Sequence, residues 1–527
     1  MNKMNSETRT DVNDAAVMQT ISQNQCIRDY CKSHNPPVSF SEITDAYEKG
    51  IIKPDPKEPD QKADMEILRD YVKSNSGAGD YQIRDYHSFG EGKGHSVLVS
   101  NGKNTYVAFD GTGKNGWIDN GEGLCGIKTD LQEQACDRFD YYATNPEFAD
   151  IMTEDNNIVI TGHSKGGNKA MYTTMNSEYG NLIDGCVSLD GQGFSPEAID
   201  YMKELYGDSG EYQDRVNKII SVSGQNDFVN ELGISIVNPE NKYVVDYKEI
   251  NAIARIPLGL DGTKETIASF HSHRYLFNQV INPFTGEVTY TSSLNKDANP
   301  GPIHAVLNDF MSQYMKLSQE ERQASAPAVM NIFQKAFGGD AKSITVADID
   351  GIMTALLQTS EGNVLMLSLA GILKYISPLL SVAVAAYCAI LLSKILSGKL
   401  NGSTVEHYIS NTPKEIMLNE ELFMEMNSSF DEAFSKAKEA AQHARQAEKI
   451  KYESQVCDAL VNNIDKRSED IKEIMRIVVE SFSSVDKENA KAARAIGESY
   501  LGTEMYSTVI PPIQTPPELA EQGIYYR

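Results

Sequence analysis

The stretch from Asn157 to Met175, NIVITGHSKGGNKAMYTTM, constrains the fold more than any other part of the chain. A run of β-branched residues leads into Gly162-His163-Ser164-Lys165-Gly166, and a segment that is compatible with a helix begins at Asn168. Glycines two residues before and two residues after a serine permit a turn so tight that larger side chains would clash there. The pattern predicts a strand, a sharp turn and a helix, with the Oγ of Ser164 exposed at the turn as a nucleophile.

The start of the helix after Ser164 is suited to holding negative charge. Its first backbone N–H groups have no acceptor within the helix, and they give this end a partial positive charge. The residue after such a nucleophile commonly donates its N–H to an oxyanion, so Lys165 is one candidate for an oxyanion hole. Thr112 is the other, because Gly111-Thr112 follows a predicted strand at 105–109 and could supply a backbone N–H and a hydroxyl. An ordinary loop explains this Gly-Thr pair equally well.

Strands alternate with helical segments in the first half of the chain, which predicts an α/β fold with a mainly parallel sheet. Two β-rich runs at 96–100 and 105–109 flank Asn101-Gly102, a hairpin signal, and 131–142 has the pattern of an amphipathic helix. Two further strands, at 185–189 and 218–222, follow the nucleophile.

The candidate acids lie at the ends of these two later strands. In α/β-hydrolases the triad residues follow in the order Ser, acid, His, and the acid usually lies beyond the second strand after the nucleophile. This order favours Asp227 over Asp190. Asp190 precedes a glycine, and capping of a turn would explain it.

The general base should follow Asp227 on a loop, and His271 and His273 are the candidates. Both lie just before a β-rich run at 275–281, and chemistry alone does not distinguish them. His304, at a predicted helix start, is more typical of a structural residue. The chosen histidine would remove the proton of Ser164, with Asp227 fixing its tautomer. This chemistry needs no cofactor and no metal.

Composition limits the function classes. The net charge of −26 argues against nucleic-acid binding, which requires a basic face. Seven cysteines, odd in number and scattered without metal-ligand spacing, argue against a disulfide framework and favour folding in a reducing cytoplasm. The N-terminus lacks the apolar core of a cleavable signal peptide, so export would use another route.

Pattern changes along the 527 residues suggest five regions. The apolar stretch at 363–400 is broken by Lys374 and Pro378, which favours a buried or membrane-contacting helical hairpin over a transmembrane helix. Two long amphipathic patterns beyond it predict an all-α domain built on an antiparallel helical hairpin. The regions are an N-terminal helical lead-in (1–80), a catalytic domain (81–295), a helical region with the apolar stretch (296–410), the long helical hairpin (411–507) and a mobile Pro-rich tail (508–527).

Residues 80–290 resemble a bacterial family of lipase-like α/β-hydrolases. The resemblance lies in Val107-Ala108-Phe109 with Gly111-Thr112, in Gly116-Trp117 with Asp119, in the Thr161–Asn168 turn, and in Asp190-Gly191 with Gly193-Phe194. In that family the strand end usually reads Ala-Phe-Arg-Gly-Thr, whereas this chain has Asp110 in the arginine position. The resemblance implies hydrolysis of carboxylic esters of lipids, and specifically phospholipase A activity.

The C-terminal region is similar to the helical hairpins of type VII secretion substrates of the WXG and LXG classes. The similarity lies mainly in 471–490, where Phe482, Asp486 and Ala490 have the characteristic spacing. It implies a lipase effector, or toxin, that is made in the bacterial cytoplasm and secreted without a signal peptide. It also implies small WXG-like helical partners on the C-terminal hairpin, contact with the secretion machinery, and a neutralising immunity protein.

Two other functions fit the same residues. An intracellular esterase, thioesterase or peptidase would use the same fold, with the C-terminal helices as an oligomerisation module. A non-catalytic binding protein attached to a membrane through 365–392 is the other alternative. Loss of hydrolysis on Ser164→Ala, and reactivity toward a serine-directed probe, would distinguish the enzyme from the binding protein.

Overall fold

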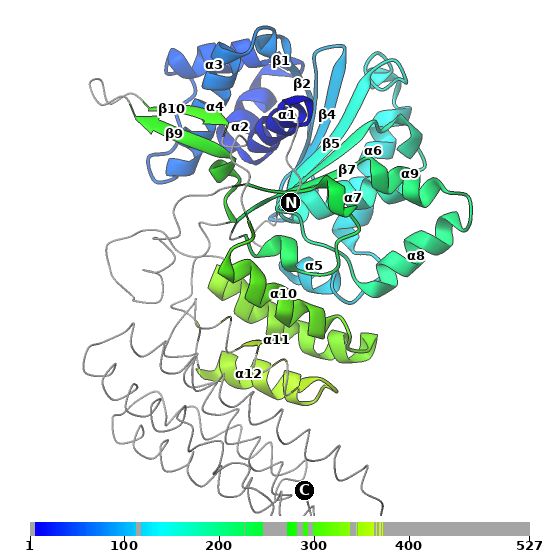
Figure 1. Ribbon diagram of the computed structural model, residues 1–527. Helices are drawn as coiled ribbons and strands as arrows, with labels where there is room; N and C mark the ends of the chain where they lie inside the picture. Colours follow the sequence, from blue (N-terminus) through cyan, green and yellow to red (C-terminus); the bar gives the residue numbers. More distant parts are fainter. Residues whose placement is uncertain are drawn as a thin grey trace, which may run out of the picture. The chain divides into compact units, whose positions relative to one another are not determined.

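Figure 1 shows the computed structural model of the chain. The structure describes residues 6–111, 117–225, 227–245, 271–281, 288–292, 299–337 and 346–362, and the single residues 344, 365, 368, 369 and 372. The chain divides into two compact units, Met1–Glu249 with Ala268–Phe337, and Ile250–Ile267 with Gly338–Arg527. The predicted hairpin at 411–507, the tail at 508–527 and most of the apolar stretch at 363–400 lie outside the described residues.

The first unit is built on an eight-stranded sheet whose strands lie in chain order, β1 to β8. The first four strands pair antiparallel, and the pairs from β4 to β8 are parallel. An α/β fold with a mostly parallel sheet is therefore confirmed, and so is the predicted hairpin of β3 and β4. The strands are β1 Val38–Ser39, β2 Gln82–Ser88, β3 His95–Ser100, β4 Asn104–Phe109, β5 Asn157–His163, β6 Gly185–Leu189, β7 Ile219–Gly224 and β8 Lys242–Val245.

Helices cover both faces of this sheet (Figure 1). Strand residues alternate between the faces: Val107 belongs to a core shared with α6, α7 and α8, whereas Tyr106 and Ala108 belong to a core shared with α1, α3 and α4. Both faces are apolar because parallel strands are normally covered on both sides. The helices are α1 Ser6–Gln23, α2 Gln25–His34, α3 Phe40–Glu48, α4 Pro59–Ser74, α5 Trp117–Glu122, α6 Asp130–Thr144, α7 Lys165–Asn176, α8 Pro196–Tyr206, α9 Glu211–Asn217, α10 Pro302–Tyr314 and α11 Gln319–Phe337.

Shorter elements complete the described fold. A second sheet consists of the antiparallel strands β9 Phe277–Ile281 and β10 Val288–Ser292. The short 3-10 helices are η1 Ala78–Asp80, η2 Pro146–Phe148, η3 Gly180–Leu182, η4 Val229–Glu231, η5 Pro239–Asn241 and η8 His273–Leu276. In the second unit the structure describes α12 Val346–Leu357, in which Ile352 and Leu356 are buried. Within the described ranges, no helix is both long and apolar enough to cross a membrane.

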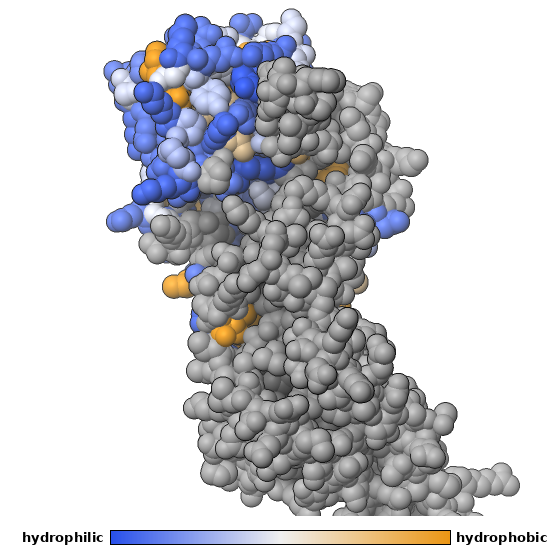
Figure 2. Space-filling model, turned by 90° about the vertical axis from the view of Figure 1, so that its left-hand side faces the viewer, coloured by the Kyte–Doolittle hydropathy of each residue, from blue (hydrophilic) through white to orange (hydrophobic). Residues whose placement is uncertain are grey.

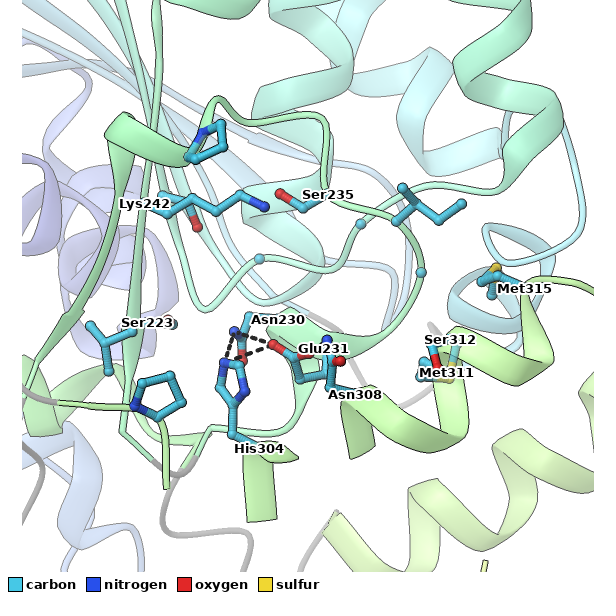
Figure 3. Close-up of a pocket in the computed structure, with 18 of the residues that line it drawn as sticks. Ser223, Asn230, Glu231, Ser235, Lys242, His304, Asn308, Met311, Ser312 and Met315 are labelled. Atoms are coloured by element: carbon cyan, nitrogen blue, oxygen red, sulfur yellow. Dashed lines mark hydrogen bonds and ion pairs between the residues drawn. The ribbon is translucent and has the colours of Figure 1, made fainter. Parts of the chain in front are cut away.

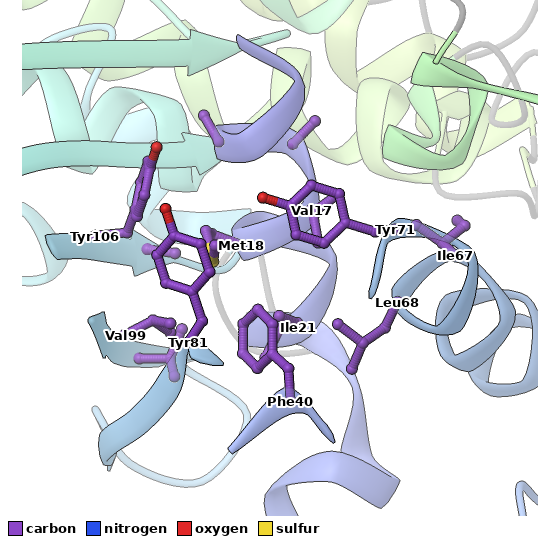
Figure 4. Close-up of a cluster of buried hydrophobic side chains, with 14 of the residues drawn as sticks. Val17, Met18, Ile21, Phe40, Ile67, Leu68, Tyr71, Tyr81, Val99 and Tyr106 are labelled. Carbon is purple, nitrogen blue, oxygen red and sulfur yellow. The ribbon is translucent and has the colours of Figure 1, made fainter. Parts of the chain in front are cut away.

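The N-terminal helices form part of the core of the first unit. Figure 4 shows Val17, Met18 and Ile21 of α1 between the tyrosines of the sheet side and the apolar face of α4. Almost every residue from Val12 to Ser22 is excluded from solvent, which explains why this helix lacks a clear apolar stripe. The outer surface of α3 and α4 is charged instead, with pairs such as Lys49–Asp45 and Lys73–Glu48, and this face is hydrophilic in Figure 2.

Candidate active site

Ser164 occupies a strained turn between β5 and α7. Its backbone has φ 60° and ψ −126°, a conformation that non-glycine residues rarely adopt and that is typical of functional sites. The turn is held on both sides, because the N–H of Ser164 donates to the carbonyl of Leu189 at 2.9 Å and its carbonyl accepts from the N–H of Asn168 at 3.2 Å. The strand, sharp turn and helix predicted around Ser164 are therefore present.

The glycines around Ser164 allow backbone segments to approach one another. A Cβ at Gly162 would lie 2.2 Å from the carbonyl carbon of Gly166, and a Cβ at Gly166 would lie 2.1 Å from the carbonyl oxygen of Phe109. A Cβ at Gly167 would meet the Oγ of Ser188 at 2.6 Å. Each position excludes a side chain for steric reasons, so the glycine pattern follows from the packing of α7 on the ends of the strands.

Asp227 and His271 lie together beyond the end of β7. Nδ1 of His271 is 2.5 Å from Oδ1 of Asp227, and the other carboxylate oxygen accepts the backbone N–H of Asn230 at 2.8 Å. Asp227 is completely buried and contacts Nδ1, the nitrogen that an acid contacts when it orients a general base. Nε2 of His271 is buried and has no hydrogen-bond partner among the described residues, the hydroxyl of Ser164 included.

His273 faces away from Asp227 and contacts the N-terminal helix α4. Its Nε2 lies 3.3 Å from Oδ1 of Asp64, and Arg274 reaches both oxygens of the same carboxylate at 2.7 and 3.2 Å. Asn24 adds a contact to Asp64 at 3.4 Å. Of the two candidate histidines, the structure thus brings His271, not His273, to Asp227, and it uses His273 and Arg274 to attach this segment to α4.

Burial favours the neutral form of the Asp227–His271 pair. Burial raises the pKa of Asp227 to about 8, although the backbone N–H groups of Asn230 and Phe228 oppose this effect. Burial also lowers the pKa of His271, to about 4. A neutral imidazole can accept a proton from a serine at Nε2 only when its own proton is on Nδ1 and is donated to an ionised Asp227. A protonated Asp227 would instead donate to Nδ1, so a general base at position 271 requires the carboxylate form of Asp227.

His163 and Asp190 lie beside His271. The rings of His163 and His271 stack with their centroids 4.5 Å apart at an angle of 29°. Asp190, the alternative acid, has φ 47° and accepts the N–H of Gly224 at 2.7 Å, so it stabilises a turn as its sequence context suggested. One potential ligand atom from each of His163, Asp190 and His271 lies within 4.8 Å of the others, so these are the described residues that could hold a metal ion. However, nearly parallel rings direct their nitrogen lone pairs side by side instead of toward a shared point, which fits packing better than coordination.

Lys165, one of the two candidates for an oxyanion hole, is the first residue of α7. Its backbone N–H lies at the helix start, while its fully buried side chain turns away to form an ion pair at 2.6 Å with Asp119 of α5. Asp119 also accepts the hydroxyl of Thr129 and the N–H of Leu131. Burial would raise the pKa of Asp119, but Lys165 and these donors hold it below its ordinary value. Thr112 lies outside the described residues.

The end of β4 approaches Ser164. A Cβ at Gly111 would lie 3.3 Å from the Cβ of Ser164. Asp110 accepts the N–H of His95 at 2.5 Å and lies 2.9 Å from its Nδ1. The buried amine of Lys169, on α7, lies 3.6 Å from the same carboxylate. Asp110 is therefore paired with a lysine on α7, the helix that follows Ser164.

Two features of the site have no signal in the sequence. Asp64 is one of several acidic residues in a polar helix, and nothing in its local pattern marks it as the anchor of a segment 209 residues away. The pairing of Lys165 with Asp119 joins residues 46 positions apart. A set of aligned sequences in which these pairs changed together would be the signal that could reveal them.

Residues 99–245 match the model of a protein family described as Mbeg1-like. The matched part runs from β3 to β8 and contains Ser164 and Asp227, but it ends before His271. No curated protein and no solved structure gives a significant match to the chain. The family description names no activity, so the function has to be argued from the site.

Proposed function

We propose that this protein is a serine hydrolase of carboxylic esters, with Ser164 as nucleophile, His271 as general base and Asp227 as the acid that orients it. The observation that carries the proposal is the buried Asp227–His271 pair, with Nδ1 on the acid and Nε2 without a partner, in the same unit as a serine on a strained strand-to-helix turn. Hydrogen bonds of a catalytic base are often long or unmade without substrate, so the missing bond from Nε2 to Ser164 is compatible with this role.

The proposed reaction has two halves. His271 takes the proton of the Ser164 hydroxyl through Nε2 while Oγ attacks the ester carbonyl, and the resulting oxyanion accepts the backbone N–H of Lys165 at the start of α7. The intermediate collapses with loss of the alcohol, which receives the proton from His271. Water then attacks the acyl-serine with His271 again as base, and the carboxylic acid leaves as the proton returns to Ser164.

Lipid esters are the proposed substrate class, with phospholipase A activity as the specific form. The resemblance to lipase-like hydrolases supports this choice, and so does an apolar surface next to the site. Ile118 of α5 is 75% exposed, and its neighbour Asp119 binds the side chain of Lys165. Ile118, Ala326, Pro327 and Met330 line a groove of about 350 Å³ between α5 and α11. Exposed apolar grooves of this kind are typical of contact with lipid or protein.

We further propose that the protein is an effector secreted by the type VII route, with residues 411–507 as its targeting hairpin. The similarity of 471–490 to type VII substrates supports this. Small WXG-like partners, the secretion machinery and an immunity protein are the partners that this proposal implies. Removal of the residues after 410 should abolish export and leave ester hydrolysis intact.

The decisive experiment is release of fatty acid from phospholipid and triglyceride vesicles by the wild type, by Ser164→Ala and by Ser209→Ala, which changes an exposed loop serine. We expect release by the wild type and by Ser209→Ala, and a loss of at least about 10³-fold in Ser164→Ala. Hydrolysis that persists in Ser164→Ala would contradict the catalytic proposal. Cleavage of short soluble esters without release from vesicles would favour the intracellular esterase instead.

A further inference from the structure

A groove with a volume of about 920 Å³ runs along the outer strands β7 and β8 of the sheet. It is bounded by the connections that follow β6 and β7 and by α10 (Figure 3). The described residues that line it do not include Ser164, Asp227 or His271, so the groove is separate from the atoms of the proposed reaction.

The floor of the groove is polar where a covered sheet would be apolar. Ser221 and Ser223 of β7 line it, whereas Ile220 and Val222 pack against the core on the other face of the sheet. Strands of a parallel sheet that are covered on both faces read as continuous apolar runs. The alternation from Ile220 to Ser223 therefore places two hydroxyl groups on the floor of the groove, beyond the point where Ile219 of the same face enters the apolar core.

The charges that line the groove favour an anionic ligand. Its one carboxylate among the described lining residues, Glu231, is bound by His304 at 2.7 Å, Asn308 at 2.6 Å and Asn230 at 3.0 Å, as Figure 3 shows in part. In contrast, no acid among the described residues lies within ion-pair distance of Lys242, whose side chain extends toward Ser235 in Figure 3. In a chain of net charge −26, an amine with no ion-pair partner in the described part of the chain is a specific attraction for a carboxylate or phosphate.

Apolar side chains line another part of the same groove. Met311 and Met315 of the segment around α10 lie at the opposite side of Figure 3 from Lys242 and Ser223. Ile234 also lines the groove and is 37% exposed. Methionine side chains adapt to irregular apolar partners, and they are common on surfaces that bind flexible ligands. The groove thus combines a lysine that has no ion pair with any described residue and an adaptable apolar wall.

We propose that this groove binds a single-chain anionic amphiphile of the fatty-acid class, with its carboxylate on Lys242 and its chain along Met311 and Met315. Fatty acids are what the proposed hydrolysis would release, so the choice of ligand rests on the proposed function, but the site itself does not use Ser164. The groove also borders the segment that holds the proposed acid, because Asn230 lines it and donates its backbone N–H to Asp227.

The test is a titration of the full chain carrying Ser164→Ala with cis-parinaric acid, a fluorescent fatty acid, followed by displacement with palmitate and with hexadecanol. We expect saturable binding of one molecule per chain, with hexadecanol at least about tenfold weaker than palmitate because it lacks the charge. Lys242→Gln should weaken palmitate about tenfold. Lys316→Gln is the matched control, because this lysine also lines the groove but its amine already donates to Gln313 at 2.9 Å, and it should change affinity less than about twofold.

Ile234→Ser tests the apolar wall, and we expect it to weaken palmitate several-fold while leaving the thermal unfolding midpoint unchanged. Absence of saturable binding would overturn the proposal, as would equal affinity in Lys242→Gln and the parent, or a larger effect of Lys316→Gln than of Lys242→Gln. Since the parent protein cannot turn over, these outcomes are independent of vesicle hydrolysis. Fatty-acid binding without Ser164-dependent hydrolysis would support the binding groove and refute the proposed function. Ser164-dependent hydrolysis without fatty-acid binding would support the proposed function and refute the binding groove.

Discussion

The attachment of the His271 segment to α4 gives a sharp prediction about a residue far from Ser164 in sequence. Asp64→Asn keeps the shape of the side chain but removes the charge that His273 and Arg274 contact. The new amide nitrogen would face the guanidinium, donor against donor. We expect the segment that begins at His271 to lose its fixed position, and the rate of ester hydrolysis to fall although Asp64 touches none of the reacting groups.

The size of the effect follows from burial. Asp64 is 2% exposed, and although burial would raise its pKa, His273 and Arg274 hold that pKa below its ordinary value, so it is ionised at neutral pH. Breaking a buried pair from one side costs about 3–5 kcal/mol. Arg274 retains a contact to Asp60 at 3.2 Å, which favours a loss in unfolding free energy near the lower limit, about 3 kcal/mol. A displacement of the base by about 1 Å can lower kcat about 100-fold.

The assay is hydrolysis of a short soluble ester, with the concentration of intact sites fixed by a serine-directed fluorophosphonate. We expect Asp64→Asn to lower kcat about 100-fold with KM within about twofold, because substrate contacts are unchanged. Asp64→Glu keeps the charge and should recover at least a tenth of the wild-type kcat. Asp60→Asn is the matched control: the Asp60 side chain is 66% exposed, its pair with Arg274 is worth at most about 1 kcal/mol, and its kcat should be unchanged.

A wild-type kcat per intact site in folded Asp64→Asn protein would refute the reasoning. A change confined to the unfolding midpoint, or an Asp64→Glu variant as slow as Asp64→Asn, would show that Asp64 supports the fold without positioning His271.

Two further predictions concern buried charges. Burial raises the pKa of Asp14 from 3.8 to about 6, so ionisation of this carboxyl destabilises the folded protein as the pH rises through that range. Asp14→Asn should therefore increase the unfolding free energy by up to about 3 kcal/mol at about pH 8 and by little below about pH 4. A difference in urea unfolding that does not change with pH would contradict this. Lys165→Met should lower the unfolding free energy by about 3–5 kcal/mol, because it leaves the buried Asp119 without its ion pair to Lys165. The double variant Lys165→Met with Asp119→Asn should recover much of that loss. If the losses in unfolding free energy of the two single variants simply add in the double variant, the two residues are not a coupled pair.

The local elements follow closely from the sequence. The hairpin expected at 96–100 and 105–109 is β3 His95–Ser100 with β4 Asn104–Phe109, and the helix expected at 131–142 is α6 Asp130–Thr144. Such segments are specified by turn residues, caps and apolar periodicity within a few positions, as in the Thr129 and Gln132 capping box that starts α6. In the helical region expected at 296–410, the described residues include α10, α11 and α12.

The N-terminal region was the least informative part of the sequence, because its polar helices carry no motif. The structure shows that α1 is buried against the sheet and that α4 holds the segment with His273. Neither role is visible locally, since each depends on which distant surface the helix covers.

The sequence by itself determined the turn at Ser164, because the steric needs of that turn fall on glycines within three residues of it. Only the tertiary structure decided which of two neighbouring histidines meets Asp227. His271 and Asp227 are 44 positions apart, and His273 is held by a carboxylate 209 positions away. Two residues of the same type in one short segment have the same local chemistry, so their difference lies entirely in the partners that folding brings to them.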